Sequence, residues 1–389
     1  MMWRERSASL AEEITHPGSG WWLPVVETPR HVLVPRYFIA GPKGWTVVES
    51  GAERRAWARA PYRDVTLVTR VGPLHADHAE PGQTVTGHPT SSSTLPSLVL
   101  TMLRHGRLHP GTRVLIVGTG TGYSTALTCR RLGSRQVTTL DVDPYLGEAA
   151  TERLDRIGHA PTVVTGDATG PLPGGDGAFD RIVSMVSVPK IPTSWLHALA
   201  PGGRLVTTLA DTSLIITADK TPDGGAQGRV EPDQAAFMAA RTGPDYPSGL
   251  DDLFETAGGE GEFVTRSSFP VIDVMASWEI WSMLSLTAPG IEHRTGVGDD
   301  GGSMAWMLHA DGSWARAHTT RVTSVTTVHQ GGPRRLYDLL DKIRWRWIRD
   351  GHLPLGGARV TVTPDGETTL SRAPWTLTLE GGDDDGRPA

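Results

Sequence analysis

The sequence VLIVGTGTGY at residues 114–123 decides the fold class of this 389-residue chain. Its first four residues, Val114–Val117, form a short apolar run and predict a strand that is buried on both faces. Three glycines alternate with threonines directly after it. Glycine suits a tight strand-to-helix turn where a ligand approaches the bare backbone. The stretch therefore predicts a strand–turn–helix unit that binds a nucleotide-like ligand.

The spacing of the glycines narrows the choice of ligand. Dinucleotide dehydrogenases use G-x-G-x-x-G, whereas here the third glycine arrives one residue early and Tyr123 takes the later position. This spacing favours the G-x-G-x-G turn of S-adenosylmethionine enzymes and disfavours an NAD-dependent oxidoreductase. A phosphate-binding loop would need Lys-Ser or Lys-Thr after the glycines, and the sequence has neither there.

Two acidic residues complete the predicted cofactor site. Asp141 follows the glycine turn by 141 minus 122, or 19 residues. A ribose-binding carboxylate is expected about 20 residues on, so Asp141 is predicted to accept hydrogen bonds from both ribose hydroxyls, with Asp143 as the weaker candidate. Asp167 is predicted to accept from the adenine amino group. The predicted site comprises Gly118, Thr119, Gly120, Thr121, Gly122, Tyr123, Asp141, Val142, Asp167 and Ala168.

Strands and helices alternate through this part of the chain. Strands are predicted at 114–117, 137–140, 163–165, 181–186 and 204–209, and helices at 95–103, 124–132 and 149–157. This rhythm is typical of a parallel sheet with right-handed crossovers. We predict an α/β fold with a Rossmann-like, doubly wound sheet, which is the class I methyltransferase architecture.

The chain is longer than one compact core usually organises, so more than one domain is expected. We predict an N-terminal segment at 1–80, an S-adenosylmethionine-binding core at 81–215, an additional C-terminal α+β domain at 216–380 and a disordered tail at 381–389. The N-terminal segment is predicted to contain short strands at 25–26, 32–34 and 65–68. The polar stretch Ala218–Asp233 is predicted to be a loop or linker.

The C-terminal domain is predicted to have a core of its own, built mostly from short strands. Four tryptophans mark it, namely Trp278, Trp281, Trp306 and Trp314. One helix is predicted from Pro333 to Gly351, with proline at its start and glycine past its end. Its predicted apolar face consists of Leu336, Leu339, Leu340, Ile343 and Trp347.

Composition excludes several classes of function. The formal net charge is −6, which argues against a general nucleic-acid binder, whose affinity depends on clustered Lys and Arg. No apolar run approaches the roughly 20 residues that span a bilayer, so no membrane partner is expected. The single cysteine, Cys129, is predicted to be a small buried residue and fits a reducing cytoplasm. His75 and His78 lack a clear third ligand, so no metal is predicted.

Several motifs carry a resemblance to one family. They are VPRYF at 34–38, APYRD at 60–64, GQTV at 82–85, FDRIV at 179–183, VPKIP at 188–192 and PGGRL at 201–205. From about Pro29 to Leu209 the chain resembles the protein L-isoaspartyl O-methyltransferases. The resemblance implies an S-adenosylmethionine-dependent carboxyl O-methyltransferase with an N-terminal segment of that family's type, acting on a peptide or protein.

The chain departs from the family pattern at residues 90–97, TSSSTLPS. Repair enzymes place a Thr-x-Ser-x-Pro signature here, and its serine lies beside the substrate carboxylate. Alignment on Pro96 puts Thr94 in that position, while a small shift would place Ser92 or Ser93 there. Their hydroxyls could hold a carboxylate nucleophile, which needs no catalytic base because it is already ionised near neutral pH. The alternative is that the cluster caps the following helix.

Over its full length the chain looks like methyltransferases associated with ribosomal peptide maturation, particularly those paired with ATP-grasp ligases. That resemblance implies methylation of an aspartate side chain in a ring-modified precursor peptide (a graspetide), followed by closure to an aspartimide. The alternatives are repair of isoaspartyl residues in damaged proteins and, from another class, a non-catalytic peptide-binding module that keeps the fold. Residues after about 215 are predicted to recognise the substrate.

Overall fold

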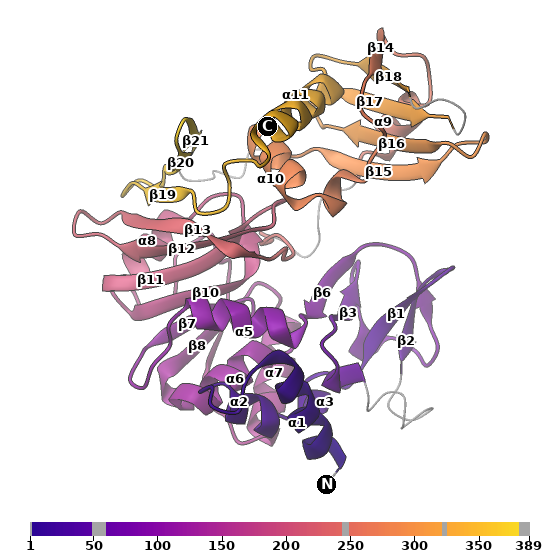
Figure 1. Cartoon of the computed structure of the whole chain (residues 1–389). Helices are drawn as coiled ribbons and strands as arrows, with labels where there is room; N and C mark the ends of the chain where they lie inside the picture. The colour runs from indigo at the N-terminus through magenta and orange to yellow at the C-terminus, as the bar shows by residue number, and fades with distance from the viewer. Residues whose placement is uncertain (1, 49–59, 243–248, 321–324, 381–389) are drawn as a thin grey trace.

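The computed structural model describes residues 2–48, 60–242, 249–320 and 325–380. The predicted disordered tail, 381–389, lies outside these ranges. Within them, three sheets of six, ten and five strands organise the fold. Figure 1 shows the N-terminal helices at one end of the molecule, the ten-stranded sheet in the middle and the five-stranded sheet at the opposite end.

The ten-stranded sheet carries the predicted α/β core. Its order is β21-β20-β19-β13-β12-β11-β10-β7-β8-β9. Its parallel part consists of β7 (Val114–Val117), β8 (Val137–Asp141), β9 (Thr162–Thr165), β10 (Phe179–Val188) and β11 (Leu199–Leu209). All four side chains of β7 are buried, as a strand covered on both faces requires. The predicted fold class is confirmed.

Four helices accompany the parallel strands. They are α5 (Pro96–His105), α6 (Tyr123–Leu132), α7 (Pro144–Arg156) and α8 (Thr193–Ala198). The first seven residues of α6 are buried, so this helix is held on all sides close to the glycine turn. The predicted helices agree with these elements within a few residues at their ends, except that α7 begins five residues earlier, at Pro144, behind its Asp143 cap.

The N-terminal segment is more helical than predicted. It contains α1 (Met2–Ile14), α2 (Trp22–Glu27) and α3 (Arg30–Leu33), followed by a sheet of β1 (Tyr37–Gly41), β2 (Gly44–Val48), β3 (Leu67–Val71), β4 (Leu74–His75), β5 (Thr84–Val85) and β6 (Pro89–Ser93). The strands predicted at 25–26 and 32–34 are therefore wrong. Val25 and Leu33 pack into one cluster with Leu127 of α6, and such tertiary packing overrides β-propensity.

The predicted loop Ala218–Asp233 is also wrong. Residues 214–234 form a hairpin of β12 (Leu214–Lys220) and β13 (Ala226–Gln234), which adds two antiparallel strands to the core sheet. The turn between them, residues 221–225, contains Pro222, Asp223, Gly224 and Gly225, which suggested a linker. Near the C-terminus, β19 (Arg359–Val362), β20 (Thr368–Arg372) and β21 (Trp375–Leu379) extend the same sheet. The sheet therefore continues across the predicted boundary at residue 215.

The remaining C-terminal elements form a separate five-stranded sheet with helices. The strands are β14 (Phe263–Ser267), β15 (Glu292–Val297), β16 (Ser303–Leu308), β17 (Trp314–Thr319) and β18 (Thr326–Gly331), and the helices are α9 (Asp251–Thr256), α10 (Trp278–Thr287) and α11 (Leu336–Asp350). Leu284 of α10 and Leu340 of α11 belong to the same hydrophobic cluster as Leu115 of β7. The predicted independent core is therefore largely shared with the methyltransferase sheet.

The helix predicted from Pro333 to Gly351 begins later, at Leu336, but ends before Gly351 as expected. Gly351 has φ +74°, a left-handed conformation that favours glycine after a helix. Leu336, Leu340 and Ile343 are buried, whereas Trp347 is 41% exposed. Trp347 is therefore outside the buried face to which it was assigned.

Candidate functional site

A cavity of about 240 Å³ lies where the ends of β6, β7 and β8 meet the start of α6. Most of the predicted cofactor residues line it, namely Gly118, Thr119, Gly120, Thr121, Tyr123, Asp141, Val142 and Ala168. The predicted Ser/Thr cluster lines the same cavity with Ser92, Ser93 and Thr94. The fold thus brings together two groups of residues that the sequence had singled out separately.

The glycine turn has the backbone shape that the sequence required. Gly118, Gly120 and Gly122 have φ values of +86°, +50° and +85°, in the region that side chains rarely adopt. A Cβ at Gly118 would lie 3.0 Å from Val186 Cγ1, and one at Gly120 would lie 3.6 Å from the carbonyl oxygen of Ser92. Gly120 therefore places the cofactor turn directly against the Ser/Thr cluster. Gly122 supports the turn from outside the cavity, against Ala150 and Leu154.

Asp141 has the surroundings of a hydroxyl-binding carboxylate. Its Oδ2 accepts from Gly120 N at 2.8 Å, and its Oδ1 accepts from Asp143 N at 3.1 Å. Burial raises the pKa of Asp141, and those two hydrogen bonds oppose the rise. A buried carboxylate in a cavity is stabilised by further donors, so a ribose with two hydroxyls suits it.

The other two acids have local roles. Asp143 caps α7 by accepting from Tyr145 N at 3.1 Å, and its Oδ2 lies 3.1 Å from His75 Nε2. The Asp167 carboxylate accepts from Thr169 N and Oγ1, both at 2.8 Å. Its neighbours Gly166 and Ala168 line the cavity, but Asp167 itself does not. Contact between Asp167 and an adenine remains a prediction.

The Ser/Thr cluster lies on and just after β6, which pairs with β3. It does not cap α5, because Asp64 Oδ1 accepts from Ser97 N at 2.8 Å and Leu95, the residue before the helix, makes no side-chain cap. The capping alternative is therefore wrong. Ser93 is 3% exposed, whereas Ser92 and Thr94 are half-buried in the cavity wall. These exposures favour Ser92 and Thr94 for direct contact with a substrate.

Arg30 donates hydrogen bonds to the Ser/Thr cluster, and no sequence pattern indicated that this arginine belongs to the site. Its guanidinium donates to Ser93 O and Thr94 O, both at 3.0 Å, and to Ser93 Oγ at 3.2 Å. It also lies over the Tyr123 ring, 5.1 Å from the ring centre. Burial lowers the pKa of Arg30 to about 10. Because long-range contacts create this site, only the tertiary structure reveals it.

The segment 236–241, after β13, forms another wall of the cavity. It bridges to Ser187 at the end of β10. Ser187 N donates to Met238 O at 2.9 Å, Ser187 Oγ donates to Phe237 O at 3.1 Å, and Ala240 N donates to Ser187 O at 2.7 Å. Sequence patterns placed this segment in a separate C-terminal domain and therefore missed it as part of the site.

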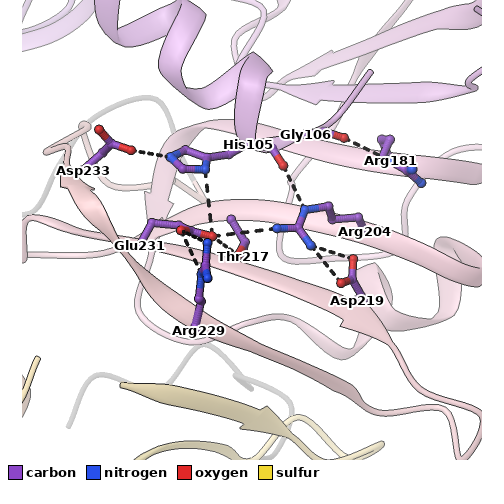
Figure 2. Close-up of polar contacts among 9 residues, drawn as sticks. All are labelled: His105, Gly106, Arg181, Arg204, Thr217, Asp219, Arg229, Glu231 and Asp233. Atoms are coloured by element: carbon purple, nitrogen blue, oxygen red, sulfur yellow. Dashed lines mark hydrogen bonds and ion pairs between the residues drawn. The ribbon is translucent and has the colours of Figure 1, made fainter. Parts of the chain in front are cut away.

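A polar network joins α5 to the hairpin that leads into this segment (Figure 2). His105 Nε2 lies 2.8 Å from Asp233 Oδ2. Arg204 Nε donates to His105 O at 2.8 Å, and its Nη1 donates to both oxygens of Asp219 at 2.8 Å. Glu231, which is 3% exposed, accepts from Thr217 Oγ1 at 2.6 Å. The arginine of the PGGRL motif therefore has a structural role outside the cavity.

The histidine pair is divided between two environments. His75 is buried and paired with Asp143, whereas His78 is exposed. From the sequence, two histidines without a third ligand are expected to be surface-loop residues, and this expectation is wrong for His75. Among the described residues, no group of three His, Cys, Asp or Glu side chains could hold a metal ion. In the same residues, no helix is both long and apolar enough to cross a membrane.

Comparisons with known proteins identify the family. The family profile described as protein-L-isoaspartate(D-aspartate) O-methyltransferase matches residues 55–236. A protein-L-isoaspartate O-methyltransferase of Koribacter versatilis is 32% identical over 183 residues, which cover 45% of this chain and 77% of the relative. The chain belongs to the protein-L-isoaspartate O-methyltransferase family. As the sequence predicted, it is an S-adenosylmethionine-dependent carboxyl O-methyltransferase.

A second relative and a solved structure give further matches. The protein-L-isoaspartate O-methyltransferase of Hyperthermus butylicus is 32% identical over 37% of this chain and 64% of the relative. A solved structure named protein-L-isoaspartate O-methyltransferase matches 95% of this chain and 99% of its own, with a TM-score of 0.51 and 16% identity. At that identity the match shows the fold alone, but it includes the elements that follow the family profile.

Proposed function

We propose that this methyltransferase esterifies the side-chain carboxylate of an aspartate in a ring-modified ribosomal precursor peptide, and that the ester then closes to an aspartimide. The observation that carries the proposal is the second sheet, β14–β18, with α10 and α11. It lies beyond the residues 55–236 that the family profile matches. An enzyme that recognises one folded peptide needs more contact surface than one that accepts many unfolded peptides.

The cavity suits a carboxylate acceptor. Ser92 and Thr94 offer hydroxyl donors beside the glycine turn, and hydroxyls can orient a carboxylate without neutralising it. Residues of β6 and of the segment 236–241 line the cavity on either side of the proposed acceptor position. Positioning and exclusion of water supply most of the rate acceleration in such a transfer.

The residues fit S-adenosylmethionine at the glycine turn. Asp141 would accept from the ribose hydroxyls, and the bare backbone of Gly118 and Gly120 would lie against the cofactor. When bound, the cofactor supplies a methyl group on a sulfonium centre. Transfer to a carboxylate oxygen would form an O–C bond while the S–C bond of the cofactor breaks, with the oxygen supplying the electron pair. No proton moves, so no general base is required.

Ring closure needs only the ester. The nitrogen of the following backbone amide attacks the ester carbonyl, loses its proton and displaces methoxide, so that one molecule of methanol leaves for each aspartimide. An ester has a far better leaving group than a carboxylate, so this step can proceed without the enzyme.

Repair of isoaspartyl residues is the second candidate. One observation favours it: the solved structure named protein-L-isoaspartate O-methyltransferase covers 95% of this chain. A protein with that name can therefore have a fold that includes the elements after residue 236. Family membership disfavours the third hypothesis, a non-catalytic peptide-binding module. We also propose a cytoplasmic location, because the chain has a single cysteine, Cys129, which cannot form an internal disulfide and so fits a reducing compartment.

Intact mass spectrometry tests the proposal. The full chain and S-adenosylmethionine are incubated with a ring-closed precursor peptide encoded beside this gene, with its linear form, and with a generic isoaspartyl peptide. A methyl gain followed by methanol loss on the ring-closed peptide alone supports the proposal. Preferential turnover of the isoaspartyl peptide establishes the repair candidate instead. A Gly120→Trp variant, which fills the cavity, serves as the inactive control.

A further inference from the structure

Among the described residues that line the cavity, two are charged. One is Asp141, and the other is Arg241 from the segment after β13. The remaining lining residues are glycines, hydroxyl-bearing side chains and apolar side chains. A guanidinium in such a wall is chemically conspicuous, because the reaction brings carboxylates into this cavity.

The backbone before Arg241 is fixed. Ala240 N donates to Ser187 O at 2.7 Å, and Ser187 N donates to Met238 O at 2.9 Å. Ser187 is 2% exposed and lies near the carboxyl end of β10. Arg241 therefore directly follows a segment that is hydrogen-bonded to the core sheet, and this bridge fixes the position of its backbone beside the cavity.

The guanidinium also acts electrostatically inside the cavity. Burial raises the pKa of Asp141, and the positive charge of Arg241 is among the influences that lower it. Both oxygens of Asp141 already accept backbone hydrogen bonds, from Gly120 N and Asp143 N. The backbone therefore supplies two hydrogen-bond donors to Asp141 without the help of Arg241.

We propose that Arg241 is the carboxylate-binding residue of this cavity. A guanidinium binds a carboxylate through two parallel, charge-assisted hydrogen bonds. Two reactants could supply the carboxylate, namely the amino-acid end of S-adenosylmethionine and the acceptor side chain of the peptide. The second source rests on the proposed function, and the first does not.

Arg241→Gln and Arg241→Lys in the full chain test the proposal. The matched control is Arg266→Gln on an exposed position of β14. Calorimetry measures the Kd of S-adenosylhomocysteine and of 5′-methylthioadenosine, which lacks the amino-acid end. Peptide methylation provides the KM for the acceptor. Loss of charge-assisted hydrogen bonds is expected to cost about ten- to a hundredfold in whichever constant depends on Arg241, with Arg241→Lys in between.

The binding constants separate the two sources. A weaker Kd for S-adenosylhomocysteine with an unchanged Kd for methylthioadenosine identifies the cofactor carboxylate as the group that Arg241 binds. An unchanged Kd for both nucleosides with a higher peptide KM identifies the acceptor carboxylate as that group. Equal weakening of both nucleosides, or no change in any constant, overturns the proposal. If the parent methylates no peptide, the proposed function fails, and the nucleoside pair still decides whether Arg241 binds the carboxylate of the cofactor. In that case an unchanged Kd for both nucleosides overturns the proposal.

Discussion

The Arg30 guanidinium and the Ser93 backbone are joined by a hydrogen bond of 3.0 Å across 63 residues of sequence. The same guanidinium reaches the carbonyl oxygens of Pro61 and Arg63 at 3.3 Å. Arg30 is 1% exposed. One side chain thereby ties α3, the loop before β3 and the end of β6 to one another, and it sets the position of the hydroxyls in the cavity wall.

Replacing Arg30 should destabilise the protein strongly. Arg30→Met leaves several buried carbonyl oxygens without donors, and each buried orphan costs about 1–3 kcal/mol. We expect the free energy of unfolding to fall by roughly 3 kcal/mol or more, measured by urea denaturation. Arg266→Met on exposed β14 is the control. A change in Arg30→Met no larger than that of the control contradicts this account.

Ser92 and Ser93 should respond differently to alanine. Ser93 Oγ accepts from buried Arg30, so Ser93→Ala should lower the unfolding free energy by about 1–3 kcal/mol. Ser92 has no hydrogen-bond partner for its hydroxyl among the described residues, so Ser92→Ala should leave stability unchanged. If Ser92 contacts the substrate, kcat/KM should fall about tenfold or more.

Parallel denaturation curves and initial rates compare the two variants. A Ser92→Ala enzyme with normal kcat/KM removes Ser92 from the substrate contacts and leaves Thr94 as the candidate. Thr94→Val, which keeps the shape without the hydroxyl, tests that residue in the same assay.

Cofactor affinity should depend on the protonation of Asp141. Burial raises its pKa above the ordinary 3.8. Only the ionised carboxylate can accept from both ribose hydroxyls, so affinity should be complete above the raised pKa and decline as pH falls through it. The stability of the free protein depends on pH in the opposite direction. The folded state binds this proton more tightly than the unfolded state, so the free energy of unfolding decreases as pH rises from 3.8 to the raised pKa.

Calorimetry of S-adenosylhomocysteine binding from neutral to acidic pH checks this dependence. Asp141→Asn should bind at least about tenfold more weakly at neutral pH and should lose the acidic decline. The same decline in parent and variant would place the responsible group elsewhere.

Truncation after residue 215 should unfold the core. It removes most of β12 and all of β13, β19, β20 and β21 from the central sheet, and it removes Glu231 from the polar network of Figure 2. Loss of these strands would leave β11 at the edge of the sheet, and buried apolar side chains such as Leu205 would then contact water. We expect aggregation or loss of the cooperative unfolding transition, followed by circular dichroism. A folded fragment that binds S-adenosylhomocysteine would contradict the shared core.

Sequence patterns predicted the parallel core well because its determinants are local. The apolar run Val114–Val117 reports a strand buried on both faces, and Gly118–Gly122 reports a turn that only glycine adopts easily. The prediction failed where packing decides. Val25 lies in a helix because it packs on α6, and the polar stretch after Lys220 forms a strand because β12 and β19 pair with it on either side.

The sequence by itself determined the glycine turn, the carboxylate at Asp141 and the family, because neighbouring residues encode each of these features. Only the tertiary structure decided which hydroxyls reach the cavity, since Arg30 holds Ser93 from a distant helix and leaves Ser92 in the wall. It also decided that residues 236–241 belong to the site. Their position depends on a bridge to Ser187. Such long-range contacts join residues far apart in the sequence, so no local pattern predicts them.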